Sequence, residues 1–152
     1  MLSDNQLKKK FEILANKLKA NLFEDVIIES QALLKKRKHQ VFFNMLSLAY
    51  QNTGQFNKSI EIMEEALRTN AKNPFFLNNM GSSHYLSGNL IKAQEYFKRG
   101  LEFAPKNINI LNNLANLKKD LNHTKEAIDY YKKALTIKND ILEIQLNLAY
   151  CY

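Results

Sequence analysis

The feature that most constrains this chain is a sequence period of 34 residues. When the chain is shifted against itself by this length, small residues fall on small residues and leucines fall on leucines. The matched positions are Gly81, Ala115 and Ala149, then Ala93 and Ala127, then Leu101 and Leu135. A unit this short cannot bury the apolar faces of its helices alone, so repetition at a fixed period requires neighbouring units to stack.

The composition favours helices over strands. The 152 residues include only 4 Gly and 2 Pro, and no stretch shows sustained alternation of apolar and polar residues. An apolar fraction of 45% suits a folded chain rather than a disordered one. We therefore expect an all-α protein that is long enough for one continuous domain.

Three regular units follow one another without insertions, at residues 40–73, 74–107 and 108–141. Each unit reads as one helix, a tight turn and a second helix. The turn positions hold Gly54, Gly88 and Asn122, which are residue types that tolerate the left-handed backbone conformation at a helix end. The sequence therefore predicts three similar helix pairs in a row.

The two ends of the chain differ from these units. Residues 1–39 have the length of a helix pair but lack the small residues of the later units, so we expect a degenerate capping pair. Residues 142–152 match the start of a first helix and stop inside it. From this stop we expect a fragment of a longer repeat protein, or an end that another molecule covers.

A family pattern accounts for the positions that recur. In the middle unit it is carried by Leu77, Met80, Gly81, His84, Gly88, Ala93, Phe97, Gly100 and Pro105. This pattern resembles the tetratricopeptide repeat (TPR), with small residues where two helices cross closely and large residues between neighbouring units. Lys118 departs from it at an aromatic position and Asn139 at the proline position. The resemblance implies a right-handed superhelical solenoid of antiparallel helix pairs.

The same resemblance implies a concave groove lined by the first helix of each unit. The groove residues that it selects here are Asn44, Met45, Asn78, Asn79, Ser82, Tyr85, Asn109, Asn112, Asn113, Asn116, Asn147 and Tyr150. Asn79, Asn113 and Asn147 fall in register and are similar to the asparagine series in the repeat domain of protein O-glycosyltransferases. An amide side chain both donates and accepts, so it can pair with the backbone of an extended peptide.

These observations lead to one principal functional hypothesis and two alternatives. The principal one is a non-enzymatic scaffold that holds an extended protein segment in an asparagine-rich groove. The first alternative is the N-terminal targeting module of a larger enzyme, such as a glycosyltransferase or sulfotransferase. The second is self-association through the open end of the stack, where Leu142, Leu146, Ala149 and Tyr150 would form an apolar strip.

Other chemistry finds little support in the sequence, and we expect no catalytic residue, metal site or cofactor. His39, His84 and His123 lack metal-ligand spacing, and no phosphate-binding loop is present. The net charge of +7 comes from 19 Lys and 3 Arg spread along the chain, so nucleic acid is an unlikely partner, although Lys35–Lys38 offers a minor alternative. The single Cys151 and the lack of a long apolar run favour a cytoplasmic protein without a transmembrane segment.

Overall fold

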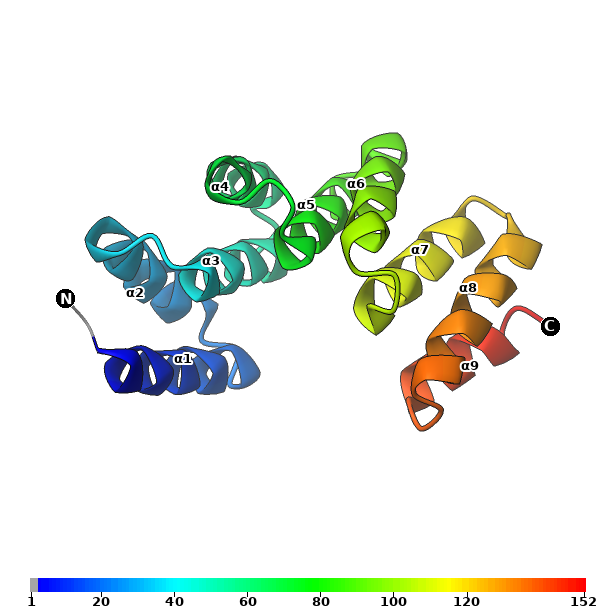
Figure 1. Ribbon diagram of the computed structural model, residues 1–152, viewed down its shortest axis with the longest axis horizontal. Helices are drawn as coiled ribbons and strands as arrows, with labels where there is room; N and C mark the ends of the chain where they lie inside the picture. Colours follow the sequence, from blue (N-terminus) through cyan, green and yellow to red (C-terminus); the bar gives the residue numbers. More distant parts are fainter. Residues whose placement is uncertain (1–2) are drawn as a thin grey trace. The chain divides into compact units, whose positions relative to one another are not determined.

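The computed structural model describes residues 3–152, and within this range the regular secondary structure is entirely helical (Figure 1). The helices are α1 (Asp4–Lys19), α2 (Phe23–Lys36), α3 (Gln40–Asn52), α4 (Phe56–Thr69), α5 (Pro74–Leu86), α6 (Leu90–Phe103), α7 (Ile108–Asp120), α8 (Thr124–Ile137) and α9 (Leu142–Ala149). They gather into two compact units, which we call unit 1 (up to Ala71) and unit 2 (Lys72–Tyr152). The predicted all-α solenoid is confirmed, and none of the described helices is long and apolar enough to cross a membrane.

Unit 1 consists of α1 to α4, with α3 packed against each of the other three helices. In Figure 1, α1 lies on one side of α3 and α4 on the other. The core contains the fully buried Leu14, Val26 and Phe42. Helix α1 begins at a capping box, in which the Ser3 side chain accepts from the Gln6 amide and the Gln6 side chain accepts from the Ser3 amide.

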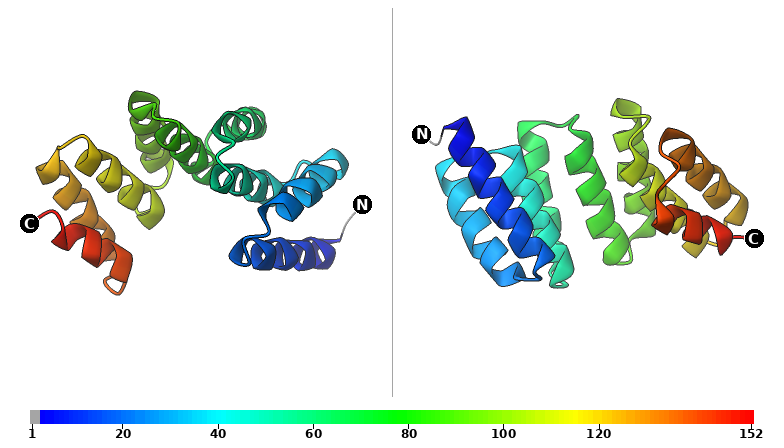
Figure 2. Two further views of the ribbon diagram at one scale, coloured as in Figure 1. Left: turned by 180° about the vertical axis from the view of Figure 1, so that it is seen from behind. Right: turned by 90° about the horizontal axis from the view of Figure 1, so that it is seen from below.

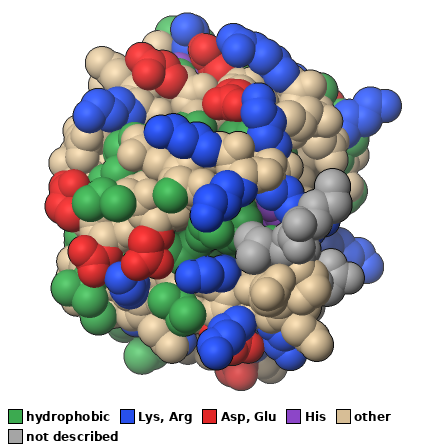
Figure 3. Space-filling view, turned by 90° about the vertical axis from the view of Figure 1, so that its left-hand side faces the viewer, with side chains coloured by type: hydrophobic (Ala, Val, Ile, Leu, Met, Phe, Trp, Pro, Cys, Tyr) green, Lys and Arg blue, Asp and Glu red, His purple; other side chains and the backbone are tan. Residues whose placement is uncertain are grey.

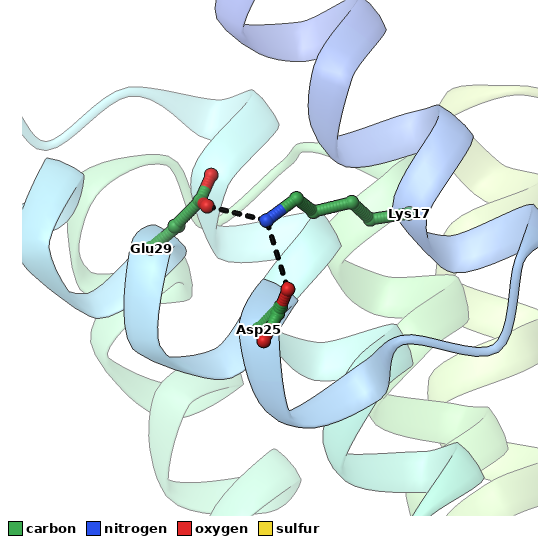
Figure 4. Close-up of polar contacts among 3 residues, drawn as sticks. All are labelled: Lys17, Asp25 and Glu29. Carbon is green, nitrogen blue, oxygen red and sulfur yellow. Dashed lines mark hydrogen bonds and ion pairs between the residues drawn. The ribbon is translucent and has the colours of Figure 1, made fainter.

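An ion-pair cluster joins α1 to α2 on the surface of unit 1 (Figure 4). The Lys17 ammonium lies 2.6 Å from the Glu29 carboxylate and 3.0 Å from that of Asp25. The hydrogen bond to Glu29, followed by that to Asp25, raises the pKa of Lys17. Because the cluster is open to water, it orients the two helices more than it stabilises them.

Unit 2 consists of α5 to α9, which pair as successive antiparallel neighbours (Figure 2). Two glycines set the distance between helices in this unit. A Cβ atom on Gly81 would lie 2.6 Å from the Phe97 ring, and one on Gly100 would lie 2.8 Å from Ile110 Cδ1. A larger residue would require the Phe97 ring or the end of the Ile110 side chain to move, so these positions confirm the expectation of small residues at close helix crossings.

The turns between paired helices use residues with positive φ angles. Gly54, Gly88 and Asn122 have φ values of 71°, 83° and 60°, so the predicted turns are present and Asn122 substitutes for glycine. Asn21, between α1 and α2, has a φ of 58° and plays the same part. The repeat pattern does not predict this turn, because residues 1–39 match the 34-residue period poorly.

Candidate functional site

The candidate site is a face of unit 2 on which polar side chains of three first helices, α5, α7 and α9, bond to one another. These helices belong to successive helix pairs, so the bonds run sideways from one pair to the next. We call this set of residues the amide face. It consists of Asn78, Ser82, Tyr85, Asn112, Asn113, Asn116, Asp120, Glu143 and Asn147.

The α5–α7 part of the amide face is centred on Asn113. Its Nδ2 group donates to Asn78 Oδ1 at 2.9 Å and to Ser82 Oγ at 3.3 Å. Asn78 and Ser82 are four residues apart and therefore lie one turn apart on the same side of α5. Both donor hydrogens of Asn113 are used, while its carbonyl oxygen accepts no hydrogen bond from the described residues.

A second bond between α5 and α7 lies one turn further along. The Tyr85 hydroxyl donates to the Asp120 carboxylate. Burial raises the pKa of Tyr85 to about 12, and the hydrogen bond to Asp120 and its negative charge add to the effect. Tyr85 is therefore neutral at physiological pH and keeps its role as the donor.

The α7–α9 part of the amide face is centred on Asn116. Its Oδ1 atom accepts from the Tyr131 hydroxyl at 2.5 Å and from Asn147 Nδ2 at 3.4 Å. Asn112 Nδ2 lies 3.5 Å from the Glu143 carboxylate, while Asn112 Oδ1 is buried without a partner among the described residues. The side-chain carbonyl oxygens of Asn112 and Asn113 can thus each accept a further hydrogen bond.

The sequence separations of these pairs explain a difference from the prediction. Bonded residues on neighbouring first helices are 31 or 35 positions apart rather than 34. A separation of 35 residues is one more than the period, and a separation of 31 residues is three fewer. Residues at these separations lie on the facing sides of two neighbouring helices. The period alone aligned Asn79 with Asn113, whereas Asn78 is the residue that bonds to Asn113.

Asn79 itself is only 8% exposed and presents little surface to a partner. It is one residue beyond Asn78 and therefore points about 100° away around the helix. Asp120 and Glu143 join the amide face through Tyr85 and Asn112, at separations of 35 and 31 residues.

The remaining predicted residues are distributed differently. Asn109, at the start of α7, and Tyr150, just after α9, are exposed. Asn44 and Met45 lie on α3 of unit 1, where Asn44 is half-buried and Met45 belongs to the apolar core. Met45 is therefore better described as a packing residue.

The titratable side chains of unit 2 that are buried take part in packing. His84 is buried and stacks on Tyr96 with ring centroids 5.5 Å apart. Lys118, whose side chain is 7% exposed, places its ammonium 2.8 Å from the Glu126 carboxylate. Among the described residues, no three His, Cys, Asp or Glu side chains are grouped so that they could hold a metal ion.

Comparison with known families decides the classification. A family model described as the tetratricopeptide repeat matches residues 76–140, and a second model with the same description matches residues 42–73. Together the two matches cover more than half of the chain. The chain belongs to the tetratricopeptide repeat family. The resemblance seen in the sequence motifs is thereby confirmed at the level of the family.

Solved TPR structures share the fold at low sequence identity. A thermophilic TPR protein of Thermus thermophilus is 20% identical over 97% of this chain and 86% of its own, with a TM-score of 0.86. Pseudomonas aeruginosa pilF is 16% identical over 95% of this chain and 66% of its own, with a TM-score of 0.82. The first TPR of Spaghetti (RPAP3), bound to the HSP90 peptide SRMEEVD, is 14% identical over 72% and 86% of the two chains, with a TM-score of 0.67.

At these identities the likeness concerns the fold alone. A comparison with curated proteins finds no match. The family supports a coarse functional statement, which is that the chain is a protein-interaction scaffold of the TPR type.

Proposed function

We propose that this TPR protein is a non-catalytic scaffold that binds an extended peptide along the amide face of unit 2. The observation that carries the proposal is the row of side-chain amides that runs across α5, α7 and α9. An extended peptide presents alternating backbone donors and acceptors, and amide side chains can satisfy both. The peptide-bound TPR of Spaghetti is a precedent for peptide binding by this fold.

The bonds within the amide face support the proposal because they fix the side chains before a partner arrives. Asn113 is held by two bonds to α5, and Asn116 accepts from both α8 and α9. A fixed side chain loses less conformational entropy when a peptide binds. The Asn113 carbonyl oxygen and the Asn116 amide hydrogens are the groups that we assign to the peptide backbone.

The charges on this face indicate which peptides it favours. Asp120 and Glu143 form no ion pair with the described residues, and Lys119 is the basic residue closest to them in the sequence on α7. Two carboxylates against one ammonium favour a neutral or basic peptide. We therefore expect this face to discriminate against acidic peptides such as SRMEEVD.

A displayed peptide library tests the proposal. The selected peptides should be extended and low in Asp and Glu. Asn113→Ala and Asn116→Ala should each weaken peptide binding about tenfold. Each substitution removes hydrogen bonds to the peptide and a hydrogen bond that holds a neighbouring side chain of the amide face in place. Asn57→Ala, at an exposed asparagine of α4, is the matched control and should leave binding unchanged. Failure to select any peptide, or unchanged binding by both groove variants, refutes the proposal.

A second proposed mode is self-association through α9. Leu142 and Leu146 are 66% and 50% exposed, and the exposed Tyr150 follows them. An apolar strip of this kind is a common interaction surface. Light scattering at increasing concentration should show a dimer that Leu142→Asp with Leu146→Asp abolishes, and a monomer at all concentrations contradicts this mode.

A further inference from the structure

Unit 1 contains a cavity of about 560 Å³ between α2 and α4, with α3 as its floor. Its apolar surface comes from Leu34, Leu46 and Ile62. The residues that line the cavity all lie between Gln31 and Glu65 and therefore belong to unit 1, whereas the amide face belongs to unit 2. Its volume is within the range of pockets that hold small organic molecules.

The cavity is lined in part by Tyr50, whose hydroxyl group has one hydrogen-bond partner among the described residues. Tyr50 is 6% exposed, and its hydroxyl oxygen accepts from Gln31 Nε2 at 2.8 Å. The hydroxyl hydrogen has no acceptor among the described residues. Burial raises the pKa of Tyr50, so the hydroxyl stays protonated and able to donate. A ligand oxygen that reaches the hydroxyl group would accept this hydrogen.

The rim of the cavity carries an excess of positive charge. Lys35, Lys38 and Lys58 line it together with Glu61 and Glu65. The Lys38 ammonium lies 2.7 Å from the Glu65 carboxylate, and the two charges offset one another. The Lys58 ammonium lies 5.8 Å from the centre of the Tyr50 ring, and Lys35 has no ion pair among the described residues. The hydroxyl donor therefore has a cation above its own ring.

The corresponding place in unit 2 shows that the repeat fold does not require such a site. Two periods later in the sequence, Tyr50 corresponds to Lys118, Lys58 to Glu126 and Ile62 to Tyr130. There, Lys118 and Glu126 satisfy one another at 2.8 Å, and the Tyr130 ring packs against the surrounding core. At these three positions unit 1 has a hydroxyl group, a lysine in place of the glutamate, and a smaller apolar side chain.

We propose that the unit 1 cavity binds a small carboxylic acid that carries an aliphatic chain. One carboxylate oxygen accepts from the Tyr50 hydroxyl, the negative charge is attracted by Lys35 and Lys58, and the chain lies on Leu34, Leu46 and Ile62. A carboxylate suits this site because it supplies both the missing acceptor and the opposite charge. An aliphatic chain suits it because the floor is apolar.

Titration of the full chain with decanoate, kept below micelle-forming concentrations, tests the proposal. Amide signals of α2, α3 and α4 should shift and saturate at one decanoate per chain. Decanol, which lacks the charge, and acetate, which lacks the chain, should each bind at least about tenfold more weakly. Equal binding of decanol, shifts confined to unit 2, or shifts that appear only with micelles overturn the proposal.

Variants locate the ligand within the cavity. Tyr50→Phe should lower the affinity about tenfold because the donor is lost, and Lys35→Gln, an exposed change that leaves the core intact, should lower it severalfold. Ile62→Tyr copies the filled site of unit 2 and should abolish binding. Lys125→Gln, an exposed change in unit 2, is the matched charge control and should have no effect. Unchanged affinity in Lys35→Gln and Ile62→Tyr, with helical content retained, contradicts the assignment.

Discussion

At the scale of single residues, Gly81 shows how one missing side chain determines the packing of a helix pair. A Cβ atom at this position would lie 2.6 Å from two carbon atoms of the Phe97 ring. Alanine is the better helix former by about 1 kcal/mol, so without this contact Gly81→Ala would stabilise the protein. We predict instead a loss of about 1–3 kcal/mol in the free energy of unfolding by urea, because the ring has to move.

A compensating substitution separates steric conflict from other causes. Phe97→Leu in the Gly81→Ala background removes the ring that the methyl group meets, and should make the effect of Gly81→Ala smaller than it is in the natural background. A stabilised Gly81→Ala protein contradicts the packing described for this helix pair.

Lys118 and Glu126 form an ion pair that should appear in the pH dependence of stability. The hydrogen bond to Lys118 is the main cause of a lowered Glu126 pKa, which lies below its ordinary value of 4.5. A carboxylate with a lowered pKa stabilises the fold above its unfolded pKa, and this contribution is lost as the pH falls through the folded value. Glu126→Gln should therefore lose less stability than the natural protein when the pH falls from about 5 to 3.

The matched control for this prediction is Glu102→Gln, at an exposed glutamate of unit 2. It should leave the acid limb of the stability curve unchanged. Thermal unfolding followed between neutral and acidic pH makes the comparison, and identical acid limbs for the natural protein and Glu126→Gln contradict the role of the pair. Glu126→Gln should also be less stable at neutral pH, since Lys118 remains buried without its carboxylate.

At the scale of helices, Asn116 connects α7 to both α8 and α9. Its one carbonyl oxygen accepts from Tyr131 and from Asn147, so the two donors share a partner. Groups that share a partner do not contribute independently. We predict that Tyr131→Phe and Asn147→Ala together change the free energy of unfolding by an amount that differs from the sum of the single changes by at least about 0.5 kcal/mol.

The control cycle pairs Asn147→Ala with Thr136→Val. Thr136 donates to a backbone carbonyl within α8 and shares no partner with Asn147. The changes that Asn147→Ala and Thr136→Val cause in the free energy of unfolding should be additive. Additive behaviour of Tyr131→Phe with Asn147→Ala contradicts a connection through Asn116.

The sequence predicted the helices better than it predicted how they face one another. Turn residues such as Gly88 and Asn122 mark the helix ends because the left-handed conformation excludes most other residues. The hydrogen bonds between neighbouring first helices depend on how each helix is rotated about its axis. A period of 34 residues does not specify that rotation. For this reason the period pairs Asn79 with Asn113, although Asn78 is the residue that bonds to Asn113.

At the scale of the whole molecule, the chain divides into two compact units, and each contains a cluster of buried apolar residues. In a repeat protein, stability is the sum of local terms and contacts between neighbours. Leu14→Ala, in the core of unit 1, should therefore increase hydrogen exchange in α1 to α3 more than in α7 and α8. Leu114→Ala, in unit 2, should show the reverse pattern, and equal loss of protection throughout the chain for both variants contradicts the division.

Charged side chains of both signs occupy the face of the molecule that Figure 3 shows. Figure 3 views the left-hand side of Figure 1 and shows basic and acidic side chains interspersed, with apolar groups between them. A mixed surface of this kind on the face shown lacks the separated basic area that nucleic acid prefers.

Neither the two units nor the cavity in unit 1 was predicted from the sequence, because both depend on how side chains of different size, such as Ile62 and Tyr130, fill the same position of the repeat.

The most direct test of the central claim is the response of the asparagine side-chain amide signals to a library-selected peptide in ¹⁵N-correlated NMR spectra. If the amide face of unit 2 binds peptide backbone, the Nδ2 signals of Asn113, Asn116 and Asn147 shift together and saturate, and Asn113→Ala removes the response. If these signals stay in place while the peptide shifts signals elsewhere, the amide face is a structural contact between helices and not the binding surface.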